Sequence, residues 1–264
     1  MRTQDQTREK IGHNVTGIEA SVYEDDMLDA HERVPRPSGD PHGIAQVRIR
    51  YAEVARPVGT VPPPRHVRGL ARSVVEMLKG NDASVLLDKL GERLAFERAG
   101  TRLYDGLLAK LDAYGSWNGG PTRAQLEEHR IDELEHLALC TDLLEQMGAD
   151  PTALTPSADL QLVATKGMID VIVDPRTTLL QSCEAALGAE MLDNACWDTL
   201  LELLLRADQQ EMAARCREAL RTEGKHVERM RRWVERGLIE KAQMGLSDVV
   251  TGARQTADEM LHRH

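Results

Sequence analysis

Long helical periods dominate the chain from residue 81 onward. Apolar side chains recur every three or four residues through residues 81–114, 121–148, 175–206 and 208–237, which places them along one face of a helix. Residues that favour helix starts open each segment, and glycine closes three of them. The starts are Asn81 or Asp82, Pro121, Asp174 with Pro175, and Asp208, and the stops are Gly115, Gly148 and Gly237. The pattern therefore predicts four long helices.

The links between these helices differ in length. The links after Tyr114 and Arg206 are short, so residues 81–148 and 175–237 each form an antiparallel hairpin. About 25 residues separate the hairpins, which leaves room for a short helix and a crossover to the far end of a bundle. Two hairpins joined by one long crossover form the ferritin-like variant of the four-helix bundle. We therefore expect an all-α protein in which residues 81–237 form a ferritin-like four-helix bundle.

The flanking regions lack this long periodicity. Residues 1–65 contain seven of the eleven prolines and mixed charges, and they are interpreted as a flexible Pro-rich arm, a candidate contact for a protein partner. Within the arm, residues 47–53 alternate like a strand, but a single strand has no partner, so an extended segment is expected. Residues 66–80 predict a short amphipathic helix that packs on its own domain more readily than on a membrane surface or a partner. Residues 238–264 predict a C-terminal helical tail.

Composition and charge narrow the function. The chain has 264 residues with 43 acidic and 33 basic side chains, and a net charge of -10 argues against a nucleic-acid partner. Aromatic residues make up only 3%, which favours helices packed on helices. The four cysteines form no C-x-x-C pair, so neither a zinc ribbon nor a rubredoxin-type iron site is expected. No secretory signal and no apolar run long enough to span a membrane is found in the sequence, so a cytoplasmic location is expected.

The two hairpins repeat one another, and acids interrupt their apolar stripes at matching places. The first helix matches the third with an offset of 93 residues, and the second matches the fourth with an offset of 90. Each of the second and fourth helices carries a Glu-x-x-His pair, which places both side chains on one helix face. The repeat-related residues are Glu97, Glu133, His136, Glu190, Glu223 and His226.

An acid on an apolar stripe must enter the core. An ionised carboxylate in a medium of low dielectric costs tens of kcal/mol, so it is neutralised, paired or bound to a cation. Four carboxylates and two imidazoles supply the charge and the bridging oxygens for two divalent ions. The spacing alone is a weak signal, because Glu259 and His262 repeat it in the tail without partner helices. A metal-free core with ordinary solvated or paired side chains is the competing interpretation, and the repeat-related positions favour the metal site.

Four motifs carry a resemblance to a known family. They are Glu97 with Tyr104 seven residues later, Glu133-Leu-Glu-His136, Glu190 with Trp197 seven residues later, and Glu223-Gly-Lys-His226. Over about residues 81–235 the chain resembles the ferritin-like di-iron carboxylate superfamily, and within it the rubrerythrin-type domain. The resemblance implies a carboxylate-bridged centre of two Fe ions, or two Mn ions. It further implies that Glu97 and Glu190 are terminal ligands, that Glu133 and Glu223 bridge, and that His136 and His226 each cap one ion.

The chain also departs from that family. No four-cysteine rubredoxin module follows, and Trp197 stands where a tyrosine is expected, which argues against rubredoxin-coupled peroxide reduction. Tyr104 and Trp197 are candidate catalytic residues that wall the centre and exchange electrons with it, although ordinary core aromatics are the simpler interpretation. Further candidates are Thr101 and Asn194 as hydrogen-bond partners of the ligand acids. Asp132 and Asp193 are alternatives for that role, and a side chain that faces water is the competing interpretation for both. Cys140 is interpreted as a buried inert thiol.

The function expected from these residues is that of a di-metal oxidoreductase. It oxidises Fe(II) or consumes O2 or peroxide at the carboxylate-bridged centre, and manganese suits the same ligands. The small-molecule partner is then O2 or peroxide, and a homo-oligomer is compatible with the fold. The alternative is a non-catalytic helical scaffold in which metal only stabilises the core and the N-terminal arm recruits a partner.

Overall fold

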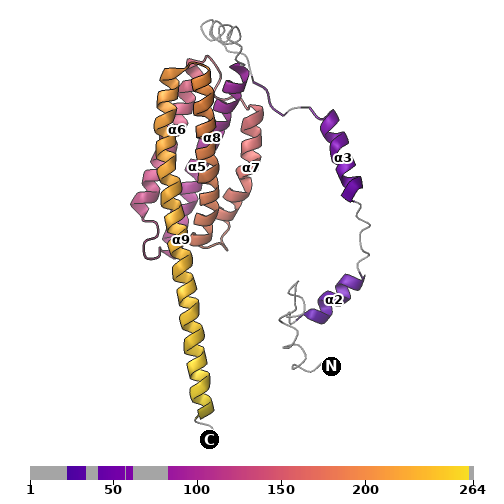
Figure 1. Ribbon diagram of the computed structural model, residues 1–264, viewed down its shortest axis with the longest axis vertical. Coiled ribbons are helices and arrows are strands. Elements are labelled where there is room, and N and C mark those ends of the chain that lie inside the picture. The colour runs from indigo at the N-terminus through magenta and orange to yellow at the C-terminus, as the bar shows by residue number, and fades with distance from the viewer. Residues whose placement is uncertain (1–22, 34–40, 57, 62–82, 262–264) are drawn as a thin grey trace. The chain divides into compact units, whose positions relative to one another are not determined.

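The computed structural model describes residues 23–33, 41–56, 58–61 and 83–261, with only the helical backbone beyond residue 243. The described elements are all helices (Figure 1), which confirms the all-α prediction for this part of the chain. They are α2 (Glu24–Arg33), α3 (Pro41–Val54), α5 (Ala83–Tyr114), α6 (Arg123–Gln146), α7 (Pro156–Val173), α8 (Leu179–Arg206) and α9 (Gln210–Leu261). The short helix predicted at 66–80 lies outside the described residues.

The chain divides into two units, residues 1–56 and 57–264, and the first contains α2 and α3. Helix α3 covers the segment for which the sequence predicted an extended conformation, so that prediction was wrong. A short alternating pattern fits a helix as well as a strand. Pro41 opens the helix, and Ile44, Val47, Tyr51 and Val54 recur at helical spacing. A helix also satisfies its backbone hydrogen bonds without a second strand.

The long helices of the second unit lie side by side (Figure 1). Helix α5 packs against α6, α7 and α8, and α9 packs against α8 and α6. Helices α6 and α8 begin later than predicted, because capping boxes formed by Thr122 with Gln125 and by Thr178 with Gln181 fix their first turns. Asp174 instead ends α7 as its C-cap. The stops predicted at Gly115 and Gly148 are confirmed, since both residues adopt a positive φ just after a helix.

Helix α7 is the predicted crossover, and it runs parallel to α5. At its start, the Ser157 hydroxyl donates to Asp88 near the beginning of α5, at 2.7 Å. At its end, Lys110 near the end of α5 donates to the carbonyl oxygens of Asp174 and, at 2.7 Å, of Thr177. These hydrogen bonds at its two ends hold α7 alongside α5. The crossover therefore returns the chain to the end of the unit where α8 begins.

The apolar core forms two clusters, and the acids predicted as metal ligands lie between them along each helix. On α5, Glu97 lies between Leu94 of the first cluster and Leu103 of the second. The flanking residues on the other helices are Leu126 and Cys140 on α6, Ala189 and Trp197 on α8, and Ala219 and Met230 on α9. All four helices thus bring their acids to one depth, with apolar packing on both sides.

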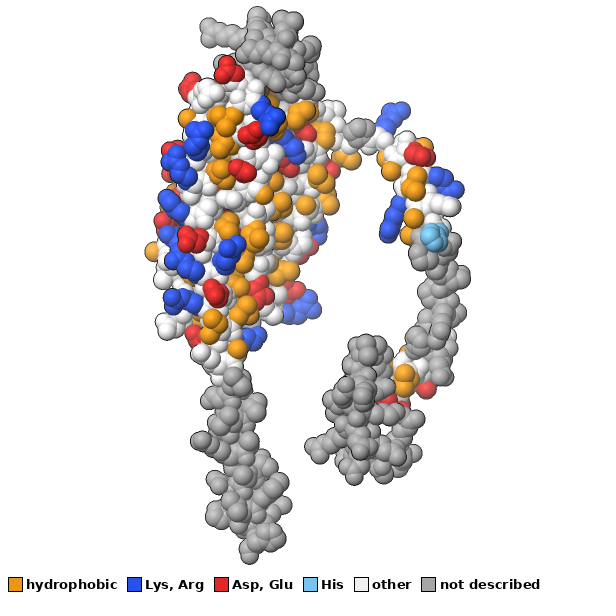
Figure 2. Space-filling view, viewed as in Figure 1, with side chains coloured by type: hydrophobic (Ala, Val, Ile, Leu, Met, Phe, Trp, Pro, Cys, Tyr) orange, Lys and Arg blue, Asp and Glu red, His pale blue; other side chains and the backbone are white. Residues whose placement is uncertain are grey.

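The outer surface contrasts with this interior. Figure 2 shows basic and acidic side chains interspersed over the visible face of the helical unit, so charge is not gathered there by sign. Among the described helices, none combines the length and the apolar character that crossing a bilayer requires.

Helix α9 continues to Leu261 and does not end at Gly237 as the sequence predicted. A Cβ at Gly237 would lie 2.6 Å from Leu180 Cδ1 and 2.9 Å from Trp117 Cε2. The glycine therefore allows Trp117, in the link between α5 and α6, to lie against α9. No proline follows it, so the helix continues past it.

This explanation of Gly237 predicts opposite effects for two glycine substitutions. Gly237→Ala should destabilise the protein, because overpacking costs about 1–3 kcal/mol and exceeds the gain of about 1 kcal/mol in helix propensity. Gly167→Ala is the control, because a Cβ at that exposed position in α7 meets nothing within 4 Å, and it should stabilise the protein by up to about 1 kcal/mol. Urea unfolding followed by circular dichroism measures both. Equal stabilisation by the two variants would contradict the explanation.

Candidate metal centre

The structure brings together all six residues predicted as metal ligands, and all six are buried. Their ligand atoms form two groups, and within each group the atoms lie within 4.8 Å of one another. One group contains Glu133, Glu190, Glu223 and His226, and the other contains Glu97, His136 and Glu223. Glu223 belongs to both groups, so the two groups lie next to each other and have one residue in common.

The atoms that face the centre lack hydrogen-bond partners. They are Glu97 Oε2, Glu133 Oε2, Glu190 Oε2, both carboxylate oxygens of Glu223, and Nδ1 of His136 and His226. A buried polar atom without a partner costs about 1–3 kcal/mol, and more when it is charged. Oxygen and imidazole nitrogen atoms in this arrangement are ligands that divalent transition metals accept. The residues present therefore fit a pair of such ions.

The orientation of His226 supports this fit. Its Nε2 lies 2.9 Å from Asp132 Oδ2, and an ionised carboxylate only accepts, so Nε2 carries the proton. The Nδ1 atom of the neutral ring then presents a lone pair to carboxylate oxygens, which requires a cation or a proton between them. Burial opposes protonation, but the hydrogen bond to Asp132 and the nearby carboxylates of Glu133, Glu190 and Glu223 raise the pKa of His226 far above its usual range. In the metal-free protein a proton thus takes the place that an ion would fill.

The charge around the centre matches two divalent ions. Five buried carboxylates converge there, and the one buried guanidinium among them belongs to Arg93. If all are ionised, one positive charge offsets one of five negative charges, and two divalent ions balance the remainder. Without ions, burial raises the pKa of Glu97 to about 8 and that of Glu223 to about 7, and neighbouring carboxylates add to both shifts. The five carboxylates belong to Glu97, Glu133, Glu190, Asp193 and Glu223.

Tyr104 and Trp197 each contact a candidate ligand that lies on the other hairpin. The Trp197 indole on α8 donates from Nε1 to Glu97 Oε1 on α5, at 3.0 Å. The Tyr104 hydroxyl on α5 donates to Glu190 Oε1 on α8. Each aromatic residue therefore holds one oxygen of a carboxylate from the other hairpin and leaves Oε2 facing the centre. Both residues thus contact candidate ligands, and their predicted roles at a metal centre and in electron exchange stay predictions.

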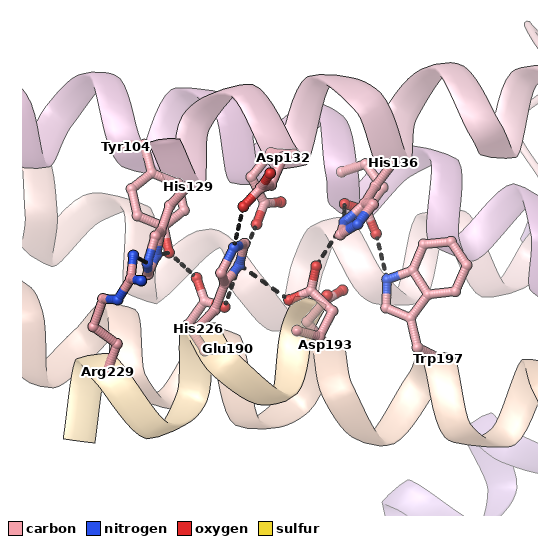
Figure 3. Close-up of polar contacts among 12 residues, drawn as sticks. Tyr104, His129, Asp132, His136, Glu190, Asp193, Trp197, His226 and Arg229 are labelled. Atoms are coloured by element: carbon pink, nitrogen blue, oxygen red, sulfur yellow. Dashed lines mark hydrogen bonds and ion pairs between the residues drawn. The ribbon is translucent and has the colours of Figure 1, made fainter. Parts of the chain in front are cut away.

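A hydrogen-bonded chain leads from Glu190 towards the surface (Figure 3). Arg229 Nη1 lies 3.1 Å from His129 Nε2, and His129 Nδ1 lies 2.9 Å from the Tyr104 hydroxyl. A guanidinium only donates, so His129 Nε2 accepts, and its Nδ1 donates to Tyr104. The Tyr104 proton must then point to Glu190. Burial lowers the pKa of His129 to about 2, so the ring stays neutral and the direction of the chain is fixed.

His129 was not predicted as a site residue, although its spacing from Glu133 places it on the same helix face. It lies four residues before Glu133 on the same face of α6, and its ring stacks on that of His226 with centroids 4.0 Å apart. The residue 90 positions later is Ala219, so the repeat that identified the ligands could not identify His129.

Two further buried groups near the centre also have no repeat-related counterpart. Arg93 Nη2 lies 2.5 Å from Asp193 Oδ1 and 3.7 Å from Glu97 Oε1. Asp193 is matched in the repeat by Gly100, where a Cβ would lie 2.1 Å from Glu133 Oε2. Gly100 thus leaves room for the Glu133 carboxylate, whereas Asp193 adds a carboxylate to the other half. Asp193, an alternative hydrogen-bond partner of the ligand acids in the sequence, is buried and pairs with Arg93, so it does not face water.

The other candidates from the sequence, Thr101, Asn194 and Cys140, have different outcomes in the structure. Thr101 donates to the carbonyl oxygen of Arg98 in its own helix at 3.0 Å, so the predicted bond to a ligand acid was wrong. No hydrogen bond joins Asn194 to Glu190 within the described part of the chain. Burial raises the pKa of Cys140 well above its usual range, which agrees with an inert thiol.

Comparison of the chain with protein-family models, with curated proteins and with solved structures finds no match. The geometry of the site and the chemistry of its side chains therefore carry the proposals that follow.

The shifted pKa values predict how the stability of the metal-free protein depends on pH. Neutral Glu97 contributes stability that is fully present below its unfolded pKa of 4.5 and is lost as the pH rises through about 8. The raised pKa values of Glu223 and His226 also make the protein less stable as the pH rises. The lowered pKa of His129 affects the stability only below about pH 6.5. The free energy of unfolding should therefore fall by at least about 2 kcal/mol from about pH 6.5 to about pH 8.5.

Urea unfolding of metal-free protein at several pH values tests this prediction. Saturating Mn²⁺ should abolish the fall, because a metal ion stabilises the deprotonated ligands. Glu97→Gln should reduce the slope without metal, since it removes one titrating group. A stability that is constant or rises over the same interval would be inconsistent with buried, protonated carboxyl groups.

Proposed function

We propose that α5, α6, α8 and α9 form a ferritin-like four-helix bundle whose centre binds two divalent transition-metal ions. We further propose that the protein is a di-metal oxidoreductase that oxidises Fe(II) or consumes O2 or peroxide. The observation that carries this proposal is the convergence of unpartnered oxygen and nitrogen atoms from all four helices into two groups that share Glu223.

The ligand groups suggest how the residues divide between the ions. Glu97 and His136 would hold one ion, and Glu190 and His226 the other. Glu223 would bridge, which agrees with its place in both groups, and the repeat assigns the same role to Glu133. Two iron or manganese ions bound by these residues would supply the two electrons that the reduction of O2 or peroxide takes.

The residues around the ligands have distinct tasks. The apolar clusters on both sides of the centre exclude water, which strengthens the electrostatic interactions inside. Trp197 and Tyr104 each hold one oxygen of a terminal carboxylate, so the other oxygen keeps its direction towards the centre. His129 and Arg229 fix the Tyr104 proton on the side of Glu190. Tyr104 therefore holds the Glu190 carboxylate through a donated hydrogen bond and keeps its proton, because burial and the neighbouring carboxylates raise the pKa of Tyr104 well above its usual range.

The sequence-based expectations on location and assembly stay predictions. They comprise the cytoplasmic location, the homo-oligomer and the contact of the N-terminal arm with a protein partner. The scaffold alternative also uses a metal-bound core, so metal binding alone does not separate it from the enzyme, and turnover does.

Glu133→Gln and Glu135→Gln test the proposed site as a matched pair. Both lie on α6 within the same motif, but Glu133 is buried at the centre whereas Glu135 is exposed. Wild type and Glu135→Gln should bind two ions per chain and consume O2 or peroxide when loaded with Fe(II). Glu133→Gln should lose at least about tenfold in metal affinity, because it removes a charged ligand oxygen.

The measurements are elemental analysis of dialysed protein and oxidant consumption under matched conditions. Metal binding by Glu133→Gln at the wild-type level would refute the proposed site. A wild-type protein that holds two ions and never consumes oxidant would favour the scaffold instead.

A further inference from the structure

We propose that the two ion positions are inequivalent, and that the position formed by Glu190 and His226 takes the first ion because Asp132 orients His226. This inference rests on the proposed function and adds an order of filling to it. Asp132 is a positioning residue here, since it acts on the ion through the imidazole.

The first observation is the environment of His226. Its Nε2 lies 2.9 Å from Asp132 Oδ2, which fixes the ring and the side that carries the proton. A carboxylate behind a ligating histidine holds the ring in place and makes the other nitrogen more basic. The Nδ1 atom is then 3.5 Å from Glu133 Oε1, 3.6 Å from Glu190 Oε2 and 3.5 Å from Glu223 Oε2. Three oxygens at nearly equal distances surround this nitrogen, so the ligand atoms are gathered before an ion arrives, and the ion replaces the proton held there.

The second observation is that His136 lacks such support. The repeat places Thr222 where Asp132 stands in the other half, and Thr222 carries no charge. In the described part of the chain, both ion-pair contacts of His136 involve its Nδ1, and none involves Nε2. Nothing acidic therefore fixes the ring from behind.

The third observation is that other groups already engage the ligands at the His136 position. His136 Nδ1 lies 2.6 Å from Glu223 Oε1, a separation that must open to admit an ion. The Arg93 guanidinium lies 3.7 Å from Glu97 Oε1 and offsets part of the negative charge that this carboxylate offers to an ion. This position also gathers three candidate ligands, against four at the other. Each difference favours the Glu190 and His226 position.

Titration of the metal-free full-length protein with Mn²⁺ tests the order of filling. Calorimetry, together with the electron paramagnetic resonance signal of free Mn²⁺, should resolve two binding steps in the wild type. Asp132→Asn should weaken the first step by about 10–100-fold and change the second little. Glu135→Gln is the matched control on the same helix, and both steps should remain as in wild type.

Three other variants locate the steps and guard against misfolding of Asp132→Asn. His226→Ala should abolish the tight step, whereas His136→Ala should retain it and lose the weak one. Thr222→Asp should strengthen the second step, because it places a carboxylate at the position that corresponds to Asp132.

The outcomes distinguish this inference from the proposed function. If the wild type binds no Mn²⁺, the metal centre itself is wrong. If it binds two ions with one affinity, or if His136→Ala rather than His226→Ala removes the tight step, the order of filling is wrong and the metal centre stands. If Asp132→Asn folds and leaves the first step unchanged, the role of Asp132 is wrong.

Discussion

The structure depends on one electrostatic constraint, which is the burial of five carboxylates at a single depth between two apolar clusters. An isolated buried charge is strongly unfavourable, and Arg93 balances only one of the five. The apolar clusters contribute the burial that stabilises the helices, and by excluding water they also raise the cost of the charges between them. Protons or cations must therefore fill the centre in every folded state. The raised pKa values and the unpartnered inward-facing atoms are two consequences of this constraint.

The repeat and its exceptions play different parts in the site. The residues that match across the repeat are the ones that face the centre, whereas the groups around them differ between the two halves. Asp132 is matched by Thr222, and Asp193 by Gly100. A duplicated hairpin thus accounts for two similar groups of candidate ligands, and the unmatched residues give each group its own surroundings. The inferred inequivalence of the two positions follows from the unmatched residues, and the ligands themselves need not differ.

Much of this site could be predicted from the sequence, because helical periodicity and the repeat both determine which side chains face inward. Glu97 and Glu190 were found in this way, since each interrupts an apolar stripe at the same place. His129 and Arg93 were not found, because their repeat-related residues are alanines and their nearest partners, Tyr104 and Asp193, lie on other helices. The sequence also misplaced the end of the last helix at Gly237, since a glycine that admits a neighbouring tryptophan looks the same in sequence as one that ends a helix.

The hydrogen bonds outside the ligand set add an ordered link between the centre and the surface. A metal that only stabilises the core needs ligands and a dry environment, both of which the bundle interior supplies. The chain from Glu190 through Tyr104 and His129 goes further, because it ends at Arg229, whose side chain is 26% exposed and pairs with Glu128 near the surface. Its direction is fixed by the chemistry of a guanidinium that only donates. Because the guanidinium does not release a proton and His129 stays neutral, this link fixes the orientation of the Tyr104 hydroxyl and of the Glu190 carboxylate, and among the described residues no matching link holds Glu97, so it preorganises one of the two candidate ligand groups.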